Sequence, residues 1–412
     1  MGKFVCAFRG RRDSYQVPLA LAEGGLLDQF ITDAYAMPWV KTLAKLGYPS
    51  VRAKVNFRSE PGLPVDLVRC LWGTTLVEHL RHRVGCAPMM TFNKLDRRFS
   101  RAAARRAARN RTDLFLYSPY AWEAFTARYH HTPRKILFQY HPHSQLECRI
   151  LAEDRARYPK VGKPSPRPTD SQWPEKFLRR ERDCWKHADL IFCASSFTKR
   201  SLIEAGCDQG RICIVPYGVQ LPATADVEPS SESFQAIFVG SGGQRKGLHH
   251  LLLAWQKGSL PASSKLTIVC RMIDRGIEEL AAATPRVELR RGVAEAELGR
   301  LYAGSSLFVM PSLAEGFGQV YLEALAQGCP VLGTPNTCLP DVGTETDGVF
   351  LVTPGNVDEL TSRLELLARS LMGNRTIRAA ARASASKFTW PSFREALRQH
   401  LLDISPRAHY QS

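Results

Sequence analysis

The chain has 412 residues, which is too long for one ordinary hydrophobic core and predicts roughly two domains. Its composition of 44% hydrophobic and 23% charged residues is typical of a globular protein, and its apolar runs fall far short of the ~20 residues that cross a bilayer. The net charge of +17 arises in residues 1–220, where 37 Lys and Arg outnumber 20 Asp and Glu, because residues 221–412 hold 19 of each.

These bulk properties limit the expected cellular location and the expected partners of the protein. The N-terminal residues lack the apolar segment and cleavage site of a signal peptide, so a cytoplasmic location is expected. Eleven scattered cysteines, an odd number without a CxxC pair, indicate reduced thiols rather than a disulfide or zinc framework. The basic first half indicates an anionic partner, which is a phosphate-bearing substrate, a membrane surface or nucleic acid.

Short apolar strands alternate with helix-like segments along the chain. In chain order, strands are predicted at residues 2–8, 112–118, 135–141, 189–195, 212–218, 234–240, 265–270, 287–292, 306–312, 330–334 and 348–354. Strands spaced by helices predict parallel sheets covered on both faces, and hence two doubly wound α/β domains. A ligand is expected in a central cleft at the carboxyl ends of the strands.

Two irregular segments interrupt this series. Residues 221–234 are rich in Pro, Ser and acidic residues and predict a linker, which divides the chain into domains at 1–220 and 221–388. Residues 159–174 carry five prolines and predict an exposed loop within the first domain. A last helix at about 389–412 is expected to cross back onto the first domain.

The segment 94–111, KLDRRFSRAAARRAARNR, is a basic helix with two possible roles. Its Lys and Arg cover about half of the helical wheel and leave Phe99, Ala103, Ala104 and Ala107 opposite. The helix can pack this alanine face on a sheet. Alternatively, an anionic bilayer would attract it by about 1 kcal/mol per basic residue. Nucleic acid is not expected as a partner, because no recognised module or interleaved aromatic residues accompany the charge.

A histidine follows the strand at 135–141, in the sequence Tyr140-His141-Pro142-His143. A histidine at this strand end can hydrogen-bond a ligand in the cleft or move a proton near neutral pH. The alternative is a helix-entry residue beside a proline at the first helical position. His143 is the weaker candidate of the two histidines.

The second half opens with FVGSGGQRKG, a strand that runs into a glycine-rich turn before a helix. Close backbone approach, free N–H groups at a helix start and the charges of Arg245 and Lys246 suit a phosphate. The turn matches neither the Walker loop nor the dinucleotide fingerprint. A tight turn with solvated basic residues is the competing interpretation.

The stretch from residue 315, EGFGQVYLEALAQGCPV, places two glutamates around a Gly-x-Gly kink. Gly316–Gly318 are predicted as the first turn of a helix that ends at Gln327-Gly328, with Glu315 at its positive end. Glu323 would lie about 10 Å from that helix start, close to the separation of two sugars across a diphosphate. Helical phasing also permits Glu323 to be a solvated carboxylate opposite the core face.

This Glu-x7-Glu stretch resembles the signature of the retaining glycosyltransferase family 4, whose members have the GT-B fold of two Rossmann-like domains. Further segments resemble that family in the same order, at residues 188–206, 211–219, 238–255, 287–293 and 298–318. The resemblance is close over about residues 185–365. It implies an acceptor-binding first domain and a nucleotide-sugar-binding second domain.

The resemblance also implies roles for individual residues. Glu323 would bind the ribose of a nucleotide sugar, Glu315 and His141 the transferred sugar, and Arg245 with Lys246 the diphosphate. The remaining donor-binding positions are glycines, their neighbours and the main chain that holds the base: Gly240, Gly242, Gly292, Val293, Gly316, Phe317 and Gly318. No metal or other cofactor is implied, because two cations and a helix end can replace one.

The implied reaction moves a sugar, with retention, from a UDP- or GDP-sugar to the hydroxyl of a carbohydrate or lipid-linked acceptor. Surface polysaccharide synthesis at the cytoplasmic face of a membrane fits this reaction. A GT-B nucleotide-sugar epimerase or hydrolase and a non-catalytic nucleotide-sugar-binding protein remain as alternatives. Two departures affect the acceptor side and the phosphate turn: Arg9–Tyr15 replace the usual Gly-Gly pair, and Gly240-Ser241-Gly242 lack the arginine often found there.

Overall fold

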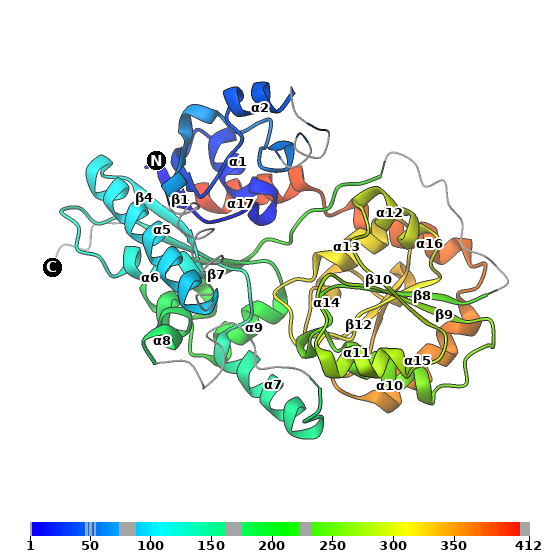
Figure 1. Cartoon of the computed structure of the whole chain (residues 1–412). Helices are drawn as coiled ribbons and strands as arrows, with labels where there is room; N and C mark the ends of the chain where they lie inside the picture. The colour runs from blue at the N-terminus through cyan, green and yellow to red at the C-terminus, as the bar shows by residue number, and fades with distance from the viewer. Residues whose placement is uncertain are drawn as a thin grey trace.

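A computed structural model of the chain describes residues 2–45, 48, 52, 55–73, 88–161, 175–222 and 233–403. Most of the predicted loop at 159–174, most of the predicted linker at 221–234 and the end of the predicted last helix therefore lie outside the described residues. Within the described part, two parallel sheets form two lobes (Figure 1).

The first sheet has seven parallel strands in the order β3-β2-β1-β4-β5-β6-β7. Its strands are β1 Phe4–Ala7, β2 Leu27–Thr32, β3 Val68–Cys70, β4 Asp113–Tyr117, β5 Lys135–Gln139, β6 Leu190–Cys193 and β7 Ile212–Ile214. The sequence reasoning missed β2 and β3. β2 carries the polar pair Asp28-Gln29, and β3 is a three-residue edge strand centred on the exposed Arg69.

The second sheet has six strands in the order β10-β9-β8-β11-β12-β13. They are β8 Gln235–Val239, β9 Lys265–Val269, β10 Val287–Arg290, β11 Leu307–Val309, β12 Val331–Gly333 and β13 Val349–Leu351. All six were predicted from the sequence. In both sheets the strand order reverses beside the first strand of the sheet. This is the doubly wound arrangement, in which ligands bind at the carboxyl ends of the strands.

Helices cover both faces of the sheets. In the first lobe they are α1 Gln16–Glu23, α2 Pro38–Lys45, α5 Pro88–Asn110, α6 Ser118–Phe125, α7 Ser144–Arg157, α8 Glu175–Asp183 and α9 Ser196–Glu204. The second lobe has α10 Leu248–Lys257, α11 Arg275–Ala282, α12 Glu295–Ala303, α13 Gln319–Ala326, α14 Leu339–Val342, α15 Val357–Ser370 and α16 Arg375–Ser386. None of the helices among the described residues is long and apolar enough to cross a membrane.

The basic segment 94–111 forms most of α5. Phe99, Ala103 and Ala107 are fully buried in the core. The alanine face therefore packs on the sheet, which was one of the two interpretations of this segment. Arg106 donates to Asp28 of β2 at 2.7 Å, which fixes the helix to the edge of the sheet.

The last helix, α17 Trp390–Asp403, lies against α1 of the first lobe (Figure 1). Arg394 pairs with Glu23 at 2.9 Å and donates to Gln16 at 2.6 Å. Val219, in the chain that leaves the first sheet, forms a parallel bridge with Thr389, in the chain that returns. The two crossings between the lobes therefore run side by side.

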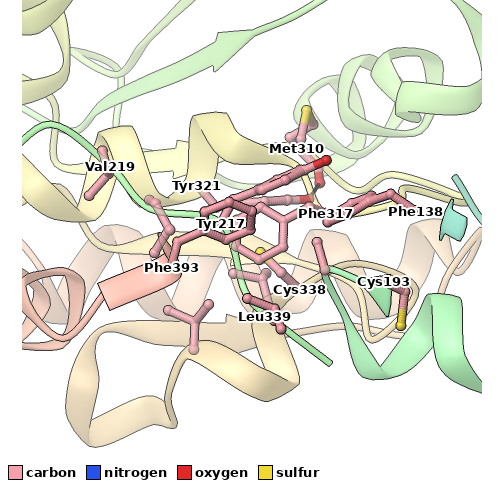
Figure 2. Close-up of a cluster of buried hydrophobic side chains, with 14 of the residues drawn as sticks. Phe138, Cys193, Tyr217, Val219, Met310, Phe317, Tyr321, Cys338, Leu339 and Phe393 are labelled. Carbon is pink, nitrogen blue, oxygen red and sulfur yellow. Dashed lines mark hydrogen bonds between the residues drawn. The ribbon is translucent and has the colours of Figure 1, made fainter. Parts of the chain in front are cut away.

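An aromatic cluster joins the two lobes and α17 (Figure 2). The Tyr217 ring stacks on Phe138 with centroids 5.6 Å apart and meets the edge of Phe317 at 5.3 Å. Phe393 of α17 packs on the same tyrosine at 5.7 Å. Because Phe138 lies near the carboxyl end of β5 and Phe317 precedes α13, this core holds the carboxyl ends of the two sheets together.

Candidate active site

The glycine-rich turn after β8 forms a short 3-10 helix at Gln244–Lys246, and α10 begins directly after Gly247. Gly240 ends the strand, and Gly242 exchanges backbone hydrogen bonds with Met272 and Asp274 on the neighbouring loop, at 2.8 and 2.9 Å. The turn is thus pinned between two loops at the carboxyl edge of the sheet.

Arg245 and Lys246 converge on Glu315. The Lys246 Nζ atom lies 2.9 Å from Glu315 Oε1, and Arg245 forms an ion pair with the same oxygen. Arg245 also donates to the carbonyl of Ala314 at 3.0 Å. Burial by itself would lower the pKa of Arg245, but the carboxylates of Glu315 and Glu147 outweigh it and raise that pKa.

The helix after Glu315 begins later than the sequence predicted. Gly318 has a φ of 87° and caps α13, which starts at Gln319. Gly316–Gly318 are therefore not the first helical turn, because a left-handed residue cannot continue an α-helix. Glu323 lies only about 6 Å along the axis from the helix start, not about 10 Å.

Gly316 lies at a close contact between the two lobes. A Cβ atom at this position would lie 1.8 Å from the Tyr140 carbonyl oxygen, so only glycine fits. The Gly316 carbonyl accepts hydrogen bonds from the hydroxyls of Ser195 and Thr198, at 2.6 and 3.1 Å. These bonds hold the residues before α13 against the first lobe.

The structure places His141 beside this contact and His143 away from it. The Cα atom of His141 would lie 3.1 Å from a Cβ at Gly316, and its ring packs on Tyr140. His143 is buried, receives a hydrogen bond from the Trp185 indole at 3.3 Å and lies 2.9 Å from the Arg182 carbonyl oxygen. Burial lowers the pKa of His143, which fits a neutral structural residue.

Glu323 occupies the half-buried face of α13 rather than a fully solvated one. The Tyr302 hydroxyl of α12 donates to its carboxylate at 3.5 Å. Burial raises the pKa of Glu323. Gly292 and Val293 follow β10, where Gly292 is exposed and Val293 packs partly into the core. The predicted donor residues thus all stand at the carboxyl edge of the second sheet.

Helix α7 brings residues to the turn that the sequence reasoning missed. The Glu147 carboxylate is buried and lies 3.9 Å from Arg245 Nε. Asp154 accepts a hydrogen bond from Gln244 at 2.7 Å, and the Nε2 atoms of His249 and His250 lie 3.1 and 2.8 Å from it. About ninety residues separate Asp154 from these partners, so no local pattern could have revealed the group.

This buried group has the ligand types of a metal site. The fold gathers one carboxylate and two imidazoles whose ligand atoms lie within 4.8 Å of one another. Asp154 already accepts from Gln244, and the Tyr158 ring packs on both imidazoles. The contacts describe a charge-assisted hydrogen-bond network between the lobes.

The loop after β1 approaches the same region from the first lobe. Asp13, Ser14 and Tyr15 have consecutive left-handed φ values of 45°, 49° and 63°. Such strained backbone clusters at functional sites. The Arg12 guanidinium lies 4.0 Å from the centre of the Tyr140 ring, and Asp13 accepts from the Tyr217 hydroxyl at 2.9 Å. This loop therefore packs beside His141, where the sequence departs from the usual Gly-Gly pair.

Comparison with known families matches both lobes. A model described as "Glycosyltransferase Family 4" matches residues 58–221, and one described as "Glycosyl transferases group 1" matches residues 233–370. The chain belongs to glycosyltransferase family 4. The two doubly wound lobes of this family 4 protein form the GT-B fold, as its sequence predicted.

Curated relatives include two mannosyltransferases. The family 4 chain is 27% identical over 213 residues to the MMP alpha-(1->4)-mannosyltransferase of Mycolicibacterium hassiacum, a match that spans 50% of the chain and 51% of the relative. It is 25% identical over 302 residues to O-antigen chain mannosyltransferase B of Escherichia coli, which spans 67% and 69%. The chain thus spans about half the length of the first relative.

Solved structures share the fold over nearly the whole chain. Sucrose-phosphate synthase of Thermosynechococcus elongatus superposes with a TM-score of 0.66 at 17% identity and covers 97% of this chain and 98% of its own. The Anabaena protein HepE, solved with UDP and glucose, gives a TM-score of 0.59 at 16% identity, covering 98% and 100%. Identities this low support the fold alone.

Proposed function

We propose that this family 4 enzyme transfers a sugar, with retention of configuration, from a nucleotide-diphosphate sugar to an acceptor hydroxyl. The observation that carries the proposal is the junction of Glu315, Arg245 and Lys246 directly before α13. Here a buried carboxylate holds two cations beside the start of a helix, at the edge where the two sheets meet. That combination would suit a sugar hydroxyl and a diphosphate bound side by side.

Each predicted residue then has a role that its position permits. Glu315 would bind hydroxyls of the transferred sugar, while Arg245 and Lys246 would hold the diphosphate. Glu323 would accept hydrogen bonds from the ribose, and the main chain at Gly292-Val293 would hold the base. The Gly240–Gly242 turn and Gly316–Gly318 would line the donor, with His141 facing the sugar from the first lobe.

Departure of the diphosphate leaving group is the step that would need the most stabilisation. The acceptor oxygen forms a bond to the anomeric carbon, the bond from that carbon to the diphosphate breaks, and the hydroxyl proton passes to the departing diphosphate. Two cations and a helix N-terminus at the diphosphate would stabilise its developing charge without a metal. Positioning by both lobes would supply the rest.

The donor and the acceptor are proposed from the relatives. Two of the relatives are mannosyltransferases, and a structural neighbour was solved with UDP and glucose, which supports a nucleotide sugar and favours UDP or GDP as the carrier. The proposed acceptor is a carbohydrate or a lipid-linked molecule. The basic first domain would bind it at the cytoplasmic face of a membrane. Polysaccharide or glycan synthesis is the setting that such acceptors imply.

A two-stage experiment tests the proposal. A panel of UDP- and GDP-sugars is screened by thermal shift, since a ligand of the native state raises its stability with affinity. The donor that raises the melting temperature is then incubated with carbohydrate acceptors, and NMR determines the anomeric configuration of the product. An inverted product contradicts retention. Free sugar or an epimerised nucleotide sugar as the only product indicates the hydrolase or epimerase instead.

A further inference from the structure

An arginine-lined pocket lies between the edge strand β3 and helix α5 in the first lobe. Arg98, Arg105 and Arg109 recur at helical spacing along α5, and Arg69 and Trp72 lie opposite them on and after β3. The pocket has a volume of about 850 Å³. This volume lies in the range of sites that take small molecules.

Most of the charge in this pocket is uncompensated. Arg106 at its wall is paired with Asp28, and Arg97 on the next face of α5 is paired with Glu123 at 3.2 Å. Among the residues that the structure describes, Arg69, Arg98, Arg105 and Arg109 have no carboxylate partner. Like charges three or four residues apart on a helix repel one another. Four guanidinium groups gathered around one cavity therefore favour an anion between them.

We propose that this pocket binds a phosphate group, carried either by a lipid headgroup or by a soluble phosphorylated molecule. Arginine suits phosphate because its planar guanidinium donates two parallel hydrogen bonds to two phosphate oxygens. Trp72 is 46% exposed and gives the pocket an apolar wall for the group that bears the phosphate. The inference does not rest on glycosyl transfer, since none of these residues belongs to the donor site.

The test compares two charge-matched double variants of the full chain. Arg98→Gln with Arg105→Gln removes two charges that line the pocket. Lys94→Gln with Arg101→Gln removes two exposed charges from the same helix that do not line it. Each variant is measured for flotation with phosphatidylcholine vesicles that contain phosphatidic acid. Each variant is also combined with Arg245→Ala and Lys246→Ala, so that the donor turn does not bind the probe. These combined variants are titrated calorimetrically with pyrophosphate.

We expect the pocket variant to lose affinity roughly a hundredfold, from about 1.5 kcal/mol for each of two arginines that would bond a charged phosphate, and the matched variant to change little. Selective loss in the vesicle arm assigns the phosphate to a lipid headgroup. Selective loss in the pyrophosphate arm assigns it to a soluble molecule. Equal losses of affinity in the two variants would indicate diffuse electrostatic attraction and would overturn the proposal. Failure of the wild-type protein to bind in either arm would overturn it as well. Unchanged melting temperatures confirm that the variants fold.

Discussion

Single residues at the junction of the lobes combine two tasks, holding the fold and presenting chemistry. Glu315 is buried because two cations accompany it, and a buried charge is costly without such partners. Glu323 is different, since its only described hydrogen bond is the long one from Tyr302. A carboxylate that contributes little to the fold is free to contribute to a ligand.

Glu323→Ala is therefore expected to weaken nucleotide-sugar binding while leaving the fold intact. A lost hydrogen bond to a charged group costs about 1.5–3 kcal/mol, or roughly tenfold to a hundredfold in affinity. Isothermal titration with the donor found by thermal shift measures the change. The exposed Glu295 on α12 provides the control substitution, Glu295→Ala. An unchanged donor affinity in Glu323→Ala would remove this residue from the site.

Gly316→Ala tests the close approach of the lobes. The added methyl would meet the Tyr140 carbonyl, and the residues before α13 would have to move away from Ser195 and Thr198. We expect a loss of stability of about 1–3 kcal/mol, as for other overpacked buried sites, and a matching loss of donor affinity. Gly210→Ala is the control, since its Cβ meets nothing closer than 3.6 Å. A wild-type melting temperature in Gly316→Ala would contradict the contact.

Whole elements show how far the sequence determined the fold. The eleven predicted strands are present because each is a short apolar run between turn residues, whereas β2 and β3 escaped notice through their polar residues and short length. The start of α13 was predicted wrongly, because a Gly-x-Gly pattern does not say which glycine takes the left-handed conformation. The partners on α7 depend on tertiary contacts alone, so Glu147 and Asp154 could not be found.

The packing of α17 on the first lobe gives a prediction at this scale. Phe393→Ala removes a fully packed ring between Tyr217 and Trp390 and is expected to cost about 3–5 kcal/mol. Leu402→Ala on the same helix is the control, since that side chain is 58% exposed. Chemical denaturation of both variants measures the difference. Equal stabilities would show that α17 does not tie the lobes together.

At the scale of the whole molecule, the buried network of Asp154, His249 and His250 makes the interface between the lobes sensitive to pH. Burial lowers the pKa of His249. Burial alone would raise the pKa of Asp154, but hydrogen bonds from the two histidines outweigh it and lower that pKa. An ionised Asp154 beside a neutral His249 is the state that the interface favours.

Both shifts act in the same direction on stability. Below about pH 6.5 the unfolded chain protonates His249 more readily than the folded one, and below about pH 4 it does the same for Asp154, so stability falls as the pH falls. Melting temperatures from pH 8 to pH 5 are expected to decline in the wild type. His249→Phe is expected to flatten that decline between pH 7 and pH 5. An identical pH profile in this variant would exclude His249 as its source.

The side-by-side crossings at Val219 and Thr389 have a mechanical consequence. Two neighbouring covalent connections act as a hinge, because they resist sliding of one lobe past the other but allow rotation about the line between them. Every other described link between the lobes is non-covalent, including the bonds to the Gly316 carbonyl and to Asp154. Opening of the lobes to admit a donor would then be a rotation about these two crossings. That rotation would break the hydrogen bonds to the Gly316 carbonyl and to Asp154.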